Sequence, residues 1–272
     1  MSQVYVFSKY VKKYFILLLS FYASLLYSES LTDIKKKGLL TVCSQAGFMP
    51  FEMKSVNGKW QGFDIELMKD FSKSLDVTLK MIDVEMDGLI PSLIGQKCEI
   101  IASGFTITAE REKVVIFSTP IRDAYLSFAT LKKSDNKSIK DYKYFLKDSK
   151  KIAVHVGTSS SLYAIKNINK ERVLSYKTQA DMISAVENGL AEAFLEDDFF
   201  VDIVNKKLKN KFDIYRTNNK TSIALAFRKN DKALKKAFDS FLKTWRAKGY
   251  YKKWSEYFFK KMLWMKEKSP SH

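Results

Sequence analysis

The residues best suited to chemistry lie in one stretch, Glu99 to Arg111, which reads Glu-Ile-Ile-Ala-Ser-Gly-Phe-Thr-Ile-Thr-Ala-Glu-Arg. It begins as a short apolar strand, turns polar at Ser103, Gly104 and Thr106, and ends with the arginine. Hydroxyls and free backbone N–H groups at a strand end can bind an anion, and a glycine lets the backbone approach it closely. The arginine can donate two parallel hydrogen bonds to a carboxylate. The stretch therefore predicts a site for a small carboxylate, although in isolation a strand, a turn and a surface arginine would be the simpler interpretation.

Two similar α/β cycles position this stretch. In the first cycle, apolar runs predict strands at 39–43, 77–82 and 100–102, with helices that begin at Asp64 and Gly88 between them. In the second, strands are expected at 152–156, 173–176 and 193–195, with helices at about 157–167, 178–190 and 199–208. Alternating strands and helices are typical of sheets covered by helices. Extended segments near 126–131 and 223–227 join the cycles, so we expect an α/β fold of two lobes with two crossovers.

The chain is long enough for one large domain or two lobes, and it is strongly basic. It has 272 residues, of which 46% are hydrophobic, and 47 Lys+Arg stand against 30 Asp+Glu for a formal charge of +17. The lysines are scattered over all the expected elements, without an aromatic and basic motif for nucleic acid. We therefore expect a solvated basic surface and no nucleic-acid partner, although such a surface could favour anionic lipid.

The N-terminus has the order of a secretory signal peptide. Lys9, Lys12 and Lys13 precede an apolar run from Tyr14 to Tyr27, and small residues follow. The run is short for a membrane span, which needs about 20 apolar residues. We expect residues 1–30 to be a signal peptide cleaved after Ser28 or Ser30, with an uncleaved anchor as the alternative. A soluble exported protein needs a second membrane to retain it, which favours the periplasm of a Gram-negative cell.

The two cysteines, Cys43 and Cys98, are expected to remain free thiols. Export would permit a disulfide. However, Cys43 falls late in one expected strand and Cys98 at the start of another. If these strands are parallel neighbours, the offset between the cysteines is about four residues, or roughly 13 Å at the strand rise, which is beyond disulfide reach. With His155 as the only histidine inside an expected element, no metal site or Cys/His nucleophile pair is predicted, and no cofactor is expected.

Seven runs, spread in order over about residues 33–260, resemble the periplasmic amino-acid-binding proteins of ABC importers, family 3 of the bacterial solute-binding proteins. Each run alone is weak, but the ordered set is specific. The runs begin at Phe48 (Phe-Met-Pro-Phe-Glu), Gly62 (Gly-Phe-Asp-Ile-Glu-Leu), Asp87 (Asp-Gly-Leu-Ile-Pro-Ser-Leu), Ser103 (Ser-Gly-Phe-Thr-Ile-Thr-Ala-Glu-Arg), Val156 (Val-Gly-Thr-Ser), Asn188 (Asn-Gly-Leu-Ala-Glu) and Lys248 (Lys-Gly-Tyr-Tyr-Lys-Lys-Trp).

The resemblance implies a type II periplasmic-binding-protein-like fold, in which an amino acid lies between two lobes that close on it. We expect lobe 1 to comprise residues 31–127 plus 226–272, and lobe 2 to comprise residues 128–225. The residues that the resemblance places at the ligand are Phe48, Met86, Ser103, Gly104, Thr106, Arg111, Ser159 and Asp197.

The roles of these residues also follow from the resemblance. Arg111 corresponds to the carboxylate-binding arginine, and Ser159 to a second carboxylate contact at a helix N-terminus, where the helix dipole favours an anion. Asp197 corresponds to the acidic partner of the α-ammonium group, with Glu196 and Asp198 leaving an ambiguity of one residue. Phe48 is expected to form an aromatic wall against the ligand side chain.

Several positions depart from the family pattern or have a simpler interpretation. Gln45 stands where several relatives of cationic specificity carry an acidic residue, which argues against a lysine or arginine ligand. Met86 replaces a common aromatic, so one wall is flexible. His155 could touch the ligand side chain, with a buried structural histidine as the alternative. Asp64 and Glu66 are interpreted as a helix N-cap and a helix surface residue.

The predicted function is a periplasmic binding protein that captures a free amino acid, with a polar or neutral side chain favoured, and delivers it to an ABC importer. We expect a monomer without enzymatic activity. The alternative is a periplasmic cyclohexadienyl (arogenate/prephenate) dehydratase on the same scaffold, because those enzymes resemble this family and also hold a carboxylate with the arginine. Glu196 and His155 would be its candidate proton donors, and the fold alone does not decide between the two.

Overall fold

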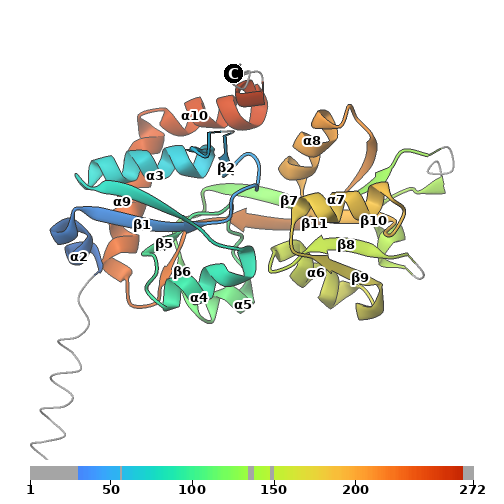
Figure 1. The fold of residues 1–272 in the computed structure, drawn as a ribbon, viewed down its shortest axis with the longest axis horizontal. Coiled ribbons are helices and arrows are strands. Elements are labelled where there is room, and N and C mark those ends of the chain that lie inside the picture. The colour runs from blue at the N-terminus through green and yellow to red at the C-terminus, as the bar shows by residue number, and fades with distance from the viewer. Residues whose placement is uncertain (1–29, 56, 134–137, 148–149, 266–272) are drawn as a thin grey trace, which may run out of the picture.

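Two β-sheets, each covered by helices, form two lobes (Figure 1). This computed structural model describes residues 30–55, 57–133, 138–147 and 150–265. The first sheet has the strand order β4-β1-β5-β12-β6. Its strands are β1 (Leu39–Ser44), β4 (Thr78–Asp83), β5 (Ile100–Ile101), β6 (Val115–Phe117) and β12 (Ala226–Arg228). β1, β4 and β5 are parallel, whereas β12 runs antiparallel to β5 and β6.

Helices lie on both faces of the first sheet because the inner strand β1 buries side chains on both of its faces. Along β1, Leu40 and Val42 pack into one apolar cluster with Phe71 of α3, and Cys43 packs into a second with Leu89 of α4. The alternation follows the period of two of a strand. The helices of this lobe are α2 (Ser30–Lys37), α3 (Phe63–Ser74), α4 (Leu89–Ile94), α5 (Ala109–Glu112), α9 (Lys232–Ala247) and α10 (Tyr250–Ser255). A small hairpin of β2 (Met53–Lys54) and β3 (Trp60–Gln61), the 3-10 turns η1 (Met86–Gly88) and η6 (Leu263–Met265), and a π-helical turn, η5 (Glu256–Lys260), complete it.

The second sheet has the order β11-β7-β10-β8-β9. β10 is parallel to β8 and antiparallel to β7, so this sheet is also mixed. Its strands are β7 (Arg122–Leu131), β8 (Ile152–His155), β9 (Val173–Tyr176), β10 (Ala193–Asp197) and β11 (Phe212–Ile223). Its helices are α6 (Ser159–Asn167), α7 (Gln179–Glu187) and α8 (Asp198–Lys207), with 3-10 turns η3 (Tyr142–Leu146) and η4 (Lys170–Arg172). The expected two-lobed α/β fold is confirmed.

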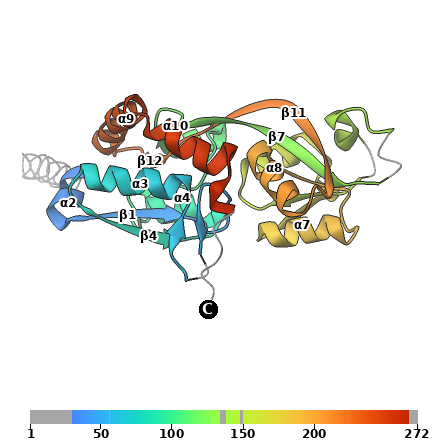
Figure 2. The same cartoon turned by 90° about the horizontal axis from the view of Figure 1, so that it is seen from above.

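The long strands β7 and β11 pair antiparallel and extend from the second lobe toward the first (Figure 2). β7 contains the predicted crossover at 126–131, whereas the predicted crossover at 223–227 begins at the last residue of β11 and ends within β12. An isolated bridge between Thr106 and Ile223 joins the end of β11 to the loop after β5. The predicted lobe boundaries at residues 127 and 225 stay predictions.

The two cysteines form a disulfide, so the prediction of free thiols is wrong. Cys43 and Cys98 are both fully buried, and their Cα atoms are 5.7 Å apart. The prediction placed Cys98 in an extended strand, but β5 begins only at Ile100, and Cys98 lies in the loop after α4. The strand rise therefore does not set its distance from Cys43, and both side chains reach the same apolar cluster on one face of the sheet.

The predicted signal peptide lies outside the described residues, except for Ser30. Within the part of the chain that the structure describes, no helix has the length and apolar character of a membrane span.

Candidate ligand-binding cleft

A cavity between the two lobes collects most of the predicted ligand residues. Its volume is about 10 Å³, so the two lobes nearly fill it. Its lining residues are Phe48, Met86, Gly104, Phe105, Thr106, Arg111, Thr158, Ser159, Glu196 and Asp197. A wider hollow of about 610 Å³, open to solvent, lies alongside and shares only Ser159 with it. We assign the site to the smaller cavity because only this one contains buried groups of opposite charge.

Arg111 supplies the positive charge. The one-turn helix α5 positions it, and Thr108 caps this helix by accepting a hydrogen bond from the Arg111 backbone N–H at 3.2 Å. The guanidinium lies 3.7 Å from the centre of the Phe105 ring. It donates to the carbonyl oxygens of Thr106 at 2.6 Å and of Gly157, in the second lobe, at 2.8 Å. A guanidinium has five N–H donors, so donors remain for a carboxylate.

Burial dominates the electrostatics of this arginine. The side chain is 6% exposed, and desolvation lowers the pKa of Arg111 to about 10 even though the charges of Asp197 and Glu196 act in the opposite direction. The group stays protonated near neutral pH. A cation held away from water attracts an anion far more strongly than it would in solvent.

Glu196 and Asp197 supply the acidic end, where β10 meets α8. Both side chains are 1% exposed. Glu196 accepts hydrogen bonds from the Ser160 hydroxyl and the Asp197 backbone N–H, both at 3.2 Å. Burial and the neighbouring Asp198 raise the pKa of Asp197 to about 7, against the opposing charge of Arg111. Burial and Asp197 raise the pKa of Glu196 well above its usual value.

Two predicted anion donors, Ser103 and Gly104, have partners inside the first lobe. The Ser103 hydroxyl donates to Glu52 at 2.8 Å, and the Gly104 backbone N–H donates to Asp64 at 2.9 Å. Ser103 is fully buried and does not line the cavity. The interpretation of Asp64 as a helix N-cap is wrong, because Gly62 occupies that position and the Asp64 side chain makes no cap bond. The buried carboxyl groups of Glu52 and Asp64 therefore hold the loop at Ser103 and Gly104 in place from within the first lobe.

Those two carboxyl groups titrate unusually. Burial raises the pKa of Asp64 to about 7, against the hydrogen bond from Gly104. Burial, followed by the charge of Asp64, raises the pKa of Glu52 well above its usual value. Glu66, by contrast, lies at the helix surface in an ion pair with Lys69, as expected.

The second lobe contributes the N-terminus of α6. Thr158 caps this helix by accepting from the Ser161 backbone N–H at 3.1 Å. The next hydroxyl, Ser159, donates to the Thr106 hydroxyl of the first lobe at 3.2 Å. The helix end thus faces the cavity that Arg111 lines, where its dipole favours an anion.

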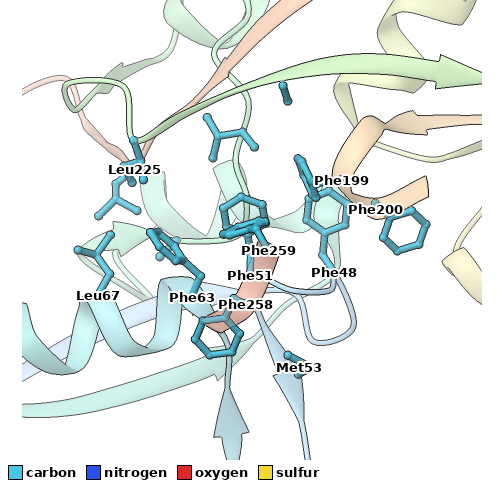
Figure 3. Close-up of a cluster of buried hydrophobic side chains, with 14 of the residues drawn as sticks. Phe48, Phe51, Met53, Phe63, Leu67, Phe199, Phe200, Leu225, Phe258 and Phe259 are labelled. Atoms are coloured by element: carbon cyan, nitrogen blue, oxygen red, sulfur yellow. The ribbon is translucent and has the colours of Figure 1, made fainter. Parts of the chain in front are cut away.

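Buried aromatic side chains, among them the cavity residue Phe48, join the two lobes (Figure 3). Phe48, in the loop after β1, is 3% exposed. Its ring centre lies 5.5 Å from that of Phe200 and 5.6 Å from that of Phe199, both on α8 of the second lobe. The ring centres of Phe51 and Phe199 are 4.9 Å apart. Met86 is a further lining residue from the first lobe.

The cavity also contains residues outside the predicted set, namely Phe105, Thr158 and Glu196. Thr158 was visible as the residue before the α6 serines, and Glu196 as a neighbour of Asp197. Phe105 follows Gly104 directly, but the sequence carried no signal that its ring would support the arginine. Among the described residues, no group of three or more His, Cys, Asp and Glu side chains is arranged to hold a metal ion.

The fold and the cavity together define a two-lobed α/β protein whose interlobe cleft can hold a small ligand with charges of both signs. Comparison with known proteins agrees with this class. Residues 40–261 match the family model of the bacterial extracellular solute-binding proteins, family 3. The chain belongs to this family.

Individual relatives are moderately similar. The ABC transporter arginine-binding protein 1 of Escherichia coli is 28% identical over 79% of this chain and 88% of its own length. The L-cystine-binding protein TcyJ of Escherichia coli is 26% identical over 84% of this chain and 85% of its own. The crystal structure of the ancestral amino acid-binding protein AncCDT-1, a precursor of cyclohexadienyl dehydratase, superposes with a TM-score of 0.78 at 32% identity, covering 85% of this chain and 99% of that one.

Proposed function

We propose that this protein binds a free amino acid between its lobes and delivers it to an ABC importer in the periplasm. One observation carries the proposal: Arg111 and Asp197, of opposite charge and both nearly fully buried, line the same interlobe cavity. An α-amino acid is a zwitterion with its carboxylate and ammonium groups attached to one carbon, and it complements this pair. In this proposal Arg111 and Ser159 hold the carboxylate, Asp197 holds the ammonium group, and Phe48 and Met86 contact the side chain.

The comparisons support the ligand class and the setting. The relatives are named for arginine and L-cystine, and the ancestral neighbour for amino acids in general. These names share the α-amino acid and differ in the side chain. Because the family is extracellular, we expect an exported, periplasmic protein. We expect it to act as a monomer.

The test is a thermal-shift screen of the purified protein against the twenty amino acids, followed by calorimetry on each hit. A ligand that binds only the folded state raises the melting temperature. Arg111→Ala should then reduce the affinity for the hit by a factor that corresponds to roughly 2–5 kcal/mol, because it leaves a desolvated carboxylate without its partner.

Arg216→Ala is the matched control, since Arg216 is an exposed arginine that pairs with Asp202 on the surface. It should bind the hit like the unmodified protein. An Arg111→Ala variant that is folded by circular dichroism and retains near-normal affinity would exclude the carboxylate assignment.

A dehydratase is the second candidate, favoured by one feature of the cavity. Glu196 is buried at the cavity wall, and burial raises its pKa, which favours the protonated form that a general acid needs in order to protonate a leaving hydroxyl. Incubation with prephenate or arogenate tests this reading. Phenylpyruvate or phenylalanine formed at enzymatic rates, and lost in Glu196→Gln, would establish the enzyme; no product above the background would exclude it.

A further inference from the structure

Three polar side chains from both lobes meet beside the ligand cavity. Gln45 follows β1, Glu85 precedes η1, and His155 ends β8 of the second lobe. The Gln45 side-chain amide donates to Glu85 Oε2 at 2.7 Å, and its nitrogen lies 3.4 Å from His155 Nε2. His155 Nε2 lies 3.0 Å from the carbonyl oxygen of Lys177. A carbonyl can only accept, so this shorter contact makes Nε2 the donor and leaves Nδ1 of the neutral ring as an acceptor.

Two acceptor atoms of this group are buried without a hydrogen-bond partner in the described part of the chain. They are Gln45 Oε1 and His155 Nδ1. The two residues are only 8% and 1% exposed, so water does not readily replace a partner. Buried polar atoms are nearly always satisfied in native proteins, and each exception calls for an explanation. A ligand group that donates hydrogen bonds would satisfy both.

The three residues adjoin the cavity, either through a contact with a lining residue or through a neighbour of one along the chain. The Gln45 backbone N–H donates to the Ser103 hydroxyl at 3.0 Å, next to the cavity residue Gly104. Glu85 immediately precedes the cavity residue Met86, and the cavity residue Thr158 donates to the His155 carbonyl at 2.7 Å. In the proposed pose, Arg111 and Asp197 hold the α-carboxylate and α-ammonium groups, and the side chain lies against Phe48 and Met86. In that pose, Gln45, Glu85 and His155 lie where the far end of a long ligand side chain would reach.

We propose that Gln45, Glu85 and His155 form the subsite for a cationic side chain, so that the ligand is a basic amino acid with a guanidinium or ammonium end. This inference rests on the proposed function and names its substrate class. The subsite offers two unpartnered acceptors and one carboxylate, and the charges of Glu85 and Asp87 both act on His155 from the first lobe. A cation with several N–H donors matches such a set, whereas a neutral amide would place its own carbonyl against acceptors.

In the sequence, Gln45 was the one residue that argued against a basic ligand. The structure places the carboxylate of Glu85, forty residues along the chain, against the same amide. The negative charge that Gln45 lacks is therefore supplied from a different position. Gln45 orients its amide toward Glu85 and keeps its own oxygen as an acceptor.

The test compares L-arginine and L-lysine with L-citrulline and L-glutamine by calorimetry at pH 8. L-Citrulline has the length of arginine but an uncharged end. We expect arginine or lysine to bind at least about tenfold more tightly than citrulline and glutamine, a difference typical of a hydrogen bond to a charged group. Glu85→Gln should weaken binding of the basic amino acid about tenfold and leave citrulline unchanged. Glu171→Gln, which neutralises an exposed carboxylate of the second lobe, should change neither.

The outcomes separate this inference from the proposed function. If citrulline, glutamine or another neutral amino acid binds as tightly as arginine and lysine, the cationic subsite is wrong and the amino-acid site stands. If Glu85→Gln weakens arginine and citrulline equally, Glu85 acts on the fold of the loop and not on the ligand charge. If no amino acid binds, both proposals fail.

Discussion

At the scale of single residues, the cleft is defined by charges held out of water. Arg111, Glu196 and Asp197 are all nearly buried, and burial is the largest cause of each pKa shift. Holding such charges apart from solvent costs free energy, and a ligand with complementary charges offsets that cost. This makes the unliganded cleft sensitive to pH.

We predict that amino-acid affinity falls as the pH is lowered. The pKa of Asp197 is raised to about 7, and the ammonium group of the ligand requires the ionised carboxylate. Below pH 7 the free protein must lose this proton to bind, so the affinity should fall by up to about tenfold per pH unit. Calorimetry from pH 5 to pH 8 measures this. In Asp197→Asn, binding should be weak and less dependent on pH, with Glu196 as the remaining titrating neighbour; an unmodified protein with constant affinity over this range would contradict the assignment.

We also predict that the unliganded protein becomes less stable as the pH rises from 5 to 8, whereas its affinity for the amino acid increases. Asp64 and Asp197 have their pKa values raised from 3.8 to about 7 in the folded state. Their contribution to the free energy of unfolding is therefore fully present below pH 3.8 and is lost as the pH rises through 7. A melting temperature of the free protein that rises with pH from 5 to 8 would show that other groups dominate. The opposite trends also ensure that weak binding at low pH is not mistaken for unfolding.

At the scale of elements, the cavity residues lie where strands end and short helices begin. Arg111 is on α5 after β5, Ser159 begins α6 after β8, and Asp197 ends β10 before α8. Such loops carry function because rigid strands position them while their backbone groups remain free. The two lobes approach closely at Gly157, where an added Cβ would lie 2.9 Å from the backbone nitrogen of Asp87 in the first lobe.

We therefore predict that Gly157→Ala weakens ligand binding by at least about tenfold, or about 1.4 kcal/mol, because the methyl group holds the lobes apart. Gly189→Ala is the matched control: the two glycines have φ of +78° and +72°, but an added Cβ at Gly189 meets nothing within 4 Å. Both variants should lose stability to a similar extent, roughly 1–2 kcal/mol for a left-handed residue. Equal affinities in the two variants would show that closure does not depend on this contact.

The disulfide yields a second prediction at this scale. Thiol labelling of the denatured, unreduced protein should give no reactive cysteine, and labelling after reduction should give two. The bond closes a loop with a sequence separation of 55 residues, and the chain-entropy model assigns such a loop about 4 kcal/mol. The combined Cys43→Ala and Cys98→Ala changes should therefore lower the free energy of unfolding by up to that amount in urea denaturation. Two labelled thiols before reduction would contradict the bond.

At the scale of the whole molecule, the cleft is nearly closed in this structure. Its volume of about 10 Å³ is far smaller than that of a typical ligand pocket, about 300–1,000 Å³. The lobes touch through the bonds from Arg111 to Gly157 and from Ser159 to Thr106, and through the aromatic contacts of Phe48. Closing without a ligand desolvates three charged groups, so a zwitterion that bridges the lobes is the species that favours closure.

We predict that the bound amino acid makes the protein more compact. The crossovers at β7 and β11 should act as a hinge, because small φ/ψ changes there swing whole lobes. Solution scattering with a saturating thermal-shift hit should give a smaller radius of gyration than without it. Asp197→Asn, which removes the charged partner in the second lobe, should weaken both binding and compaction. Superimposable curves for the free and bound protein would favour a cleft that is already closed, as in an enzyme.

Much of this protein is determined by its sequence alone. Hydrophobic periodicity sets the strands and helices because it reports local burial, and the two α/β cycles follow from it. Turn glycines and caps such as Thr178 are also local signals. The ordered runs carried the family resemblance, which placed Arg111, Ser159 and Asp197 at the ligand, and the structure has all three lining one cavity.

Only the tertiary structure decided which distant residues become partners. Glu52 and Asp64 use the donors of Ser103 and Gly104, and Cys98 lies outside the strand and reaches Cys43. Gln45 meets Glu85 within the first lobe and His155 across the cleft. Each of these pairs lies forty or more residues apart or in different lobes. Their distances depend on strand register, loop path and lobe position, which arise from packing of the whole chain and leave no periodic signal in the residues themselves.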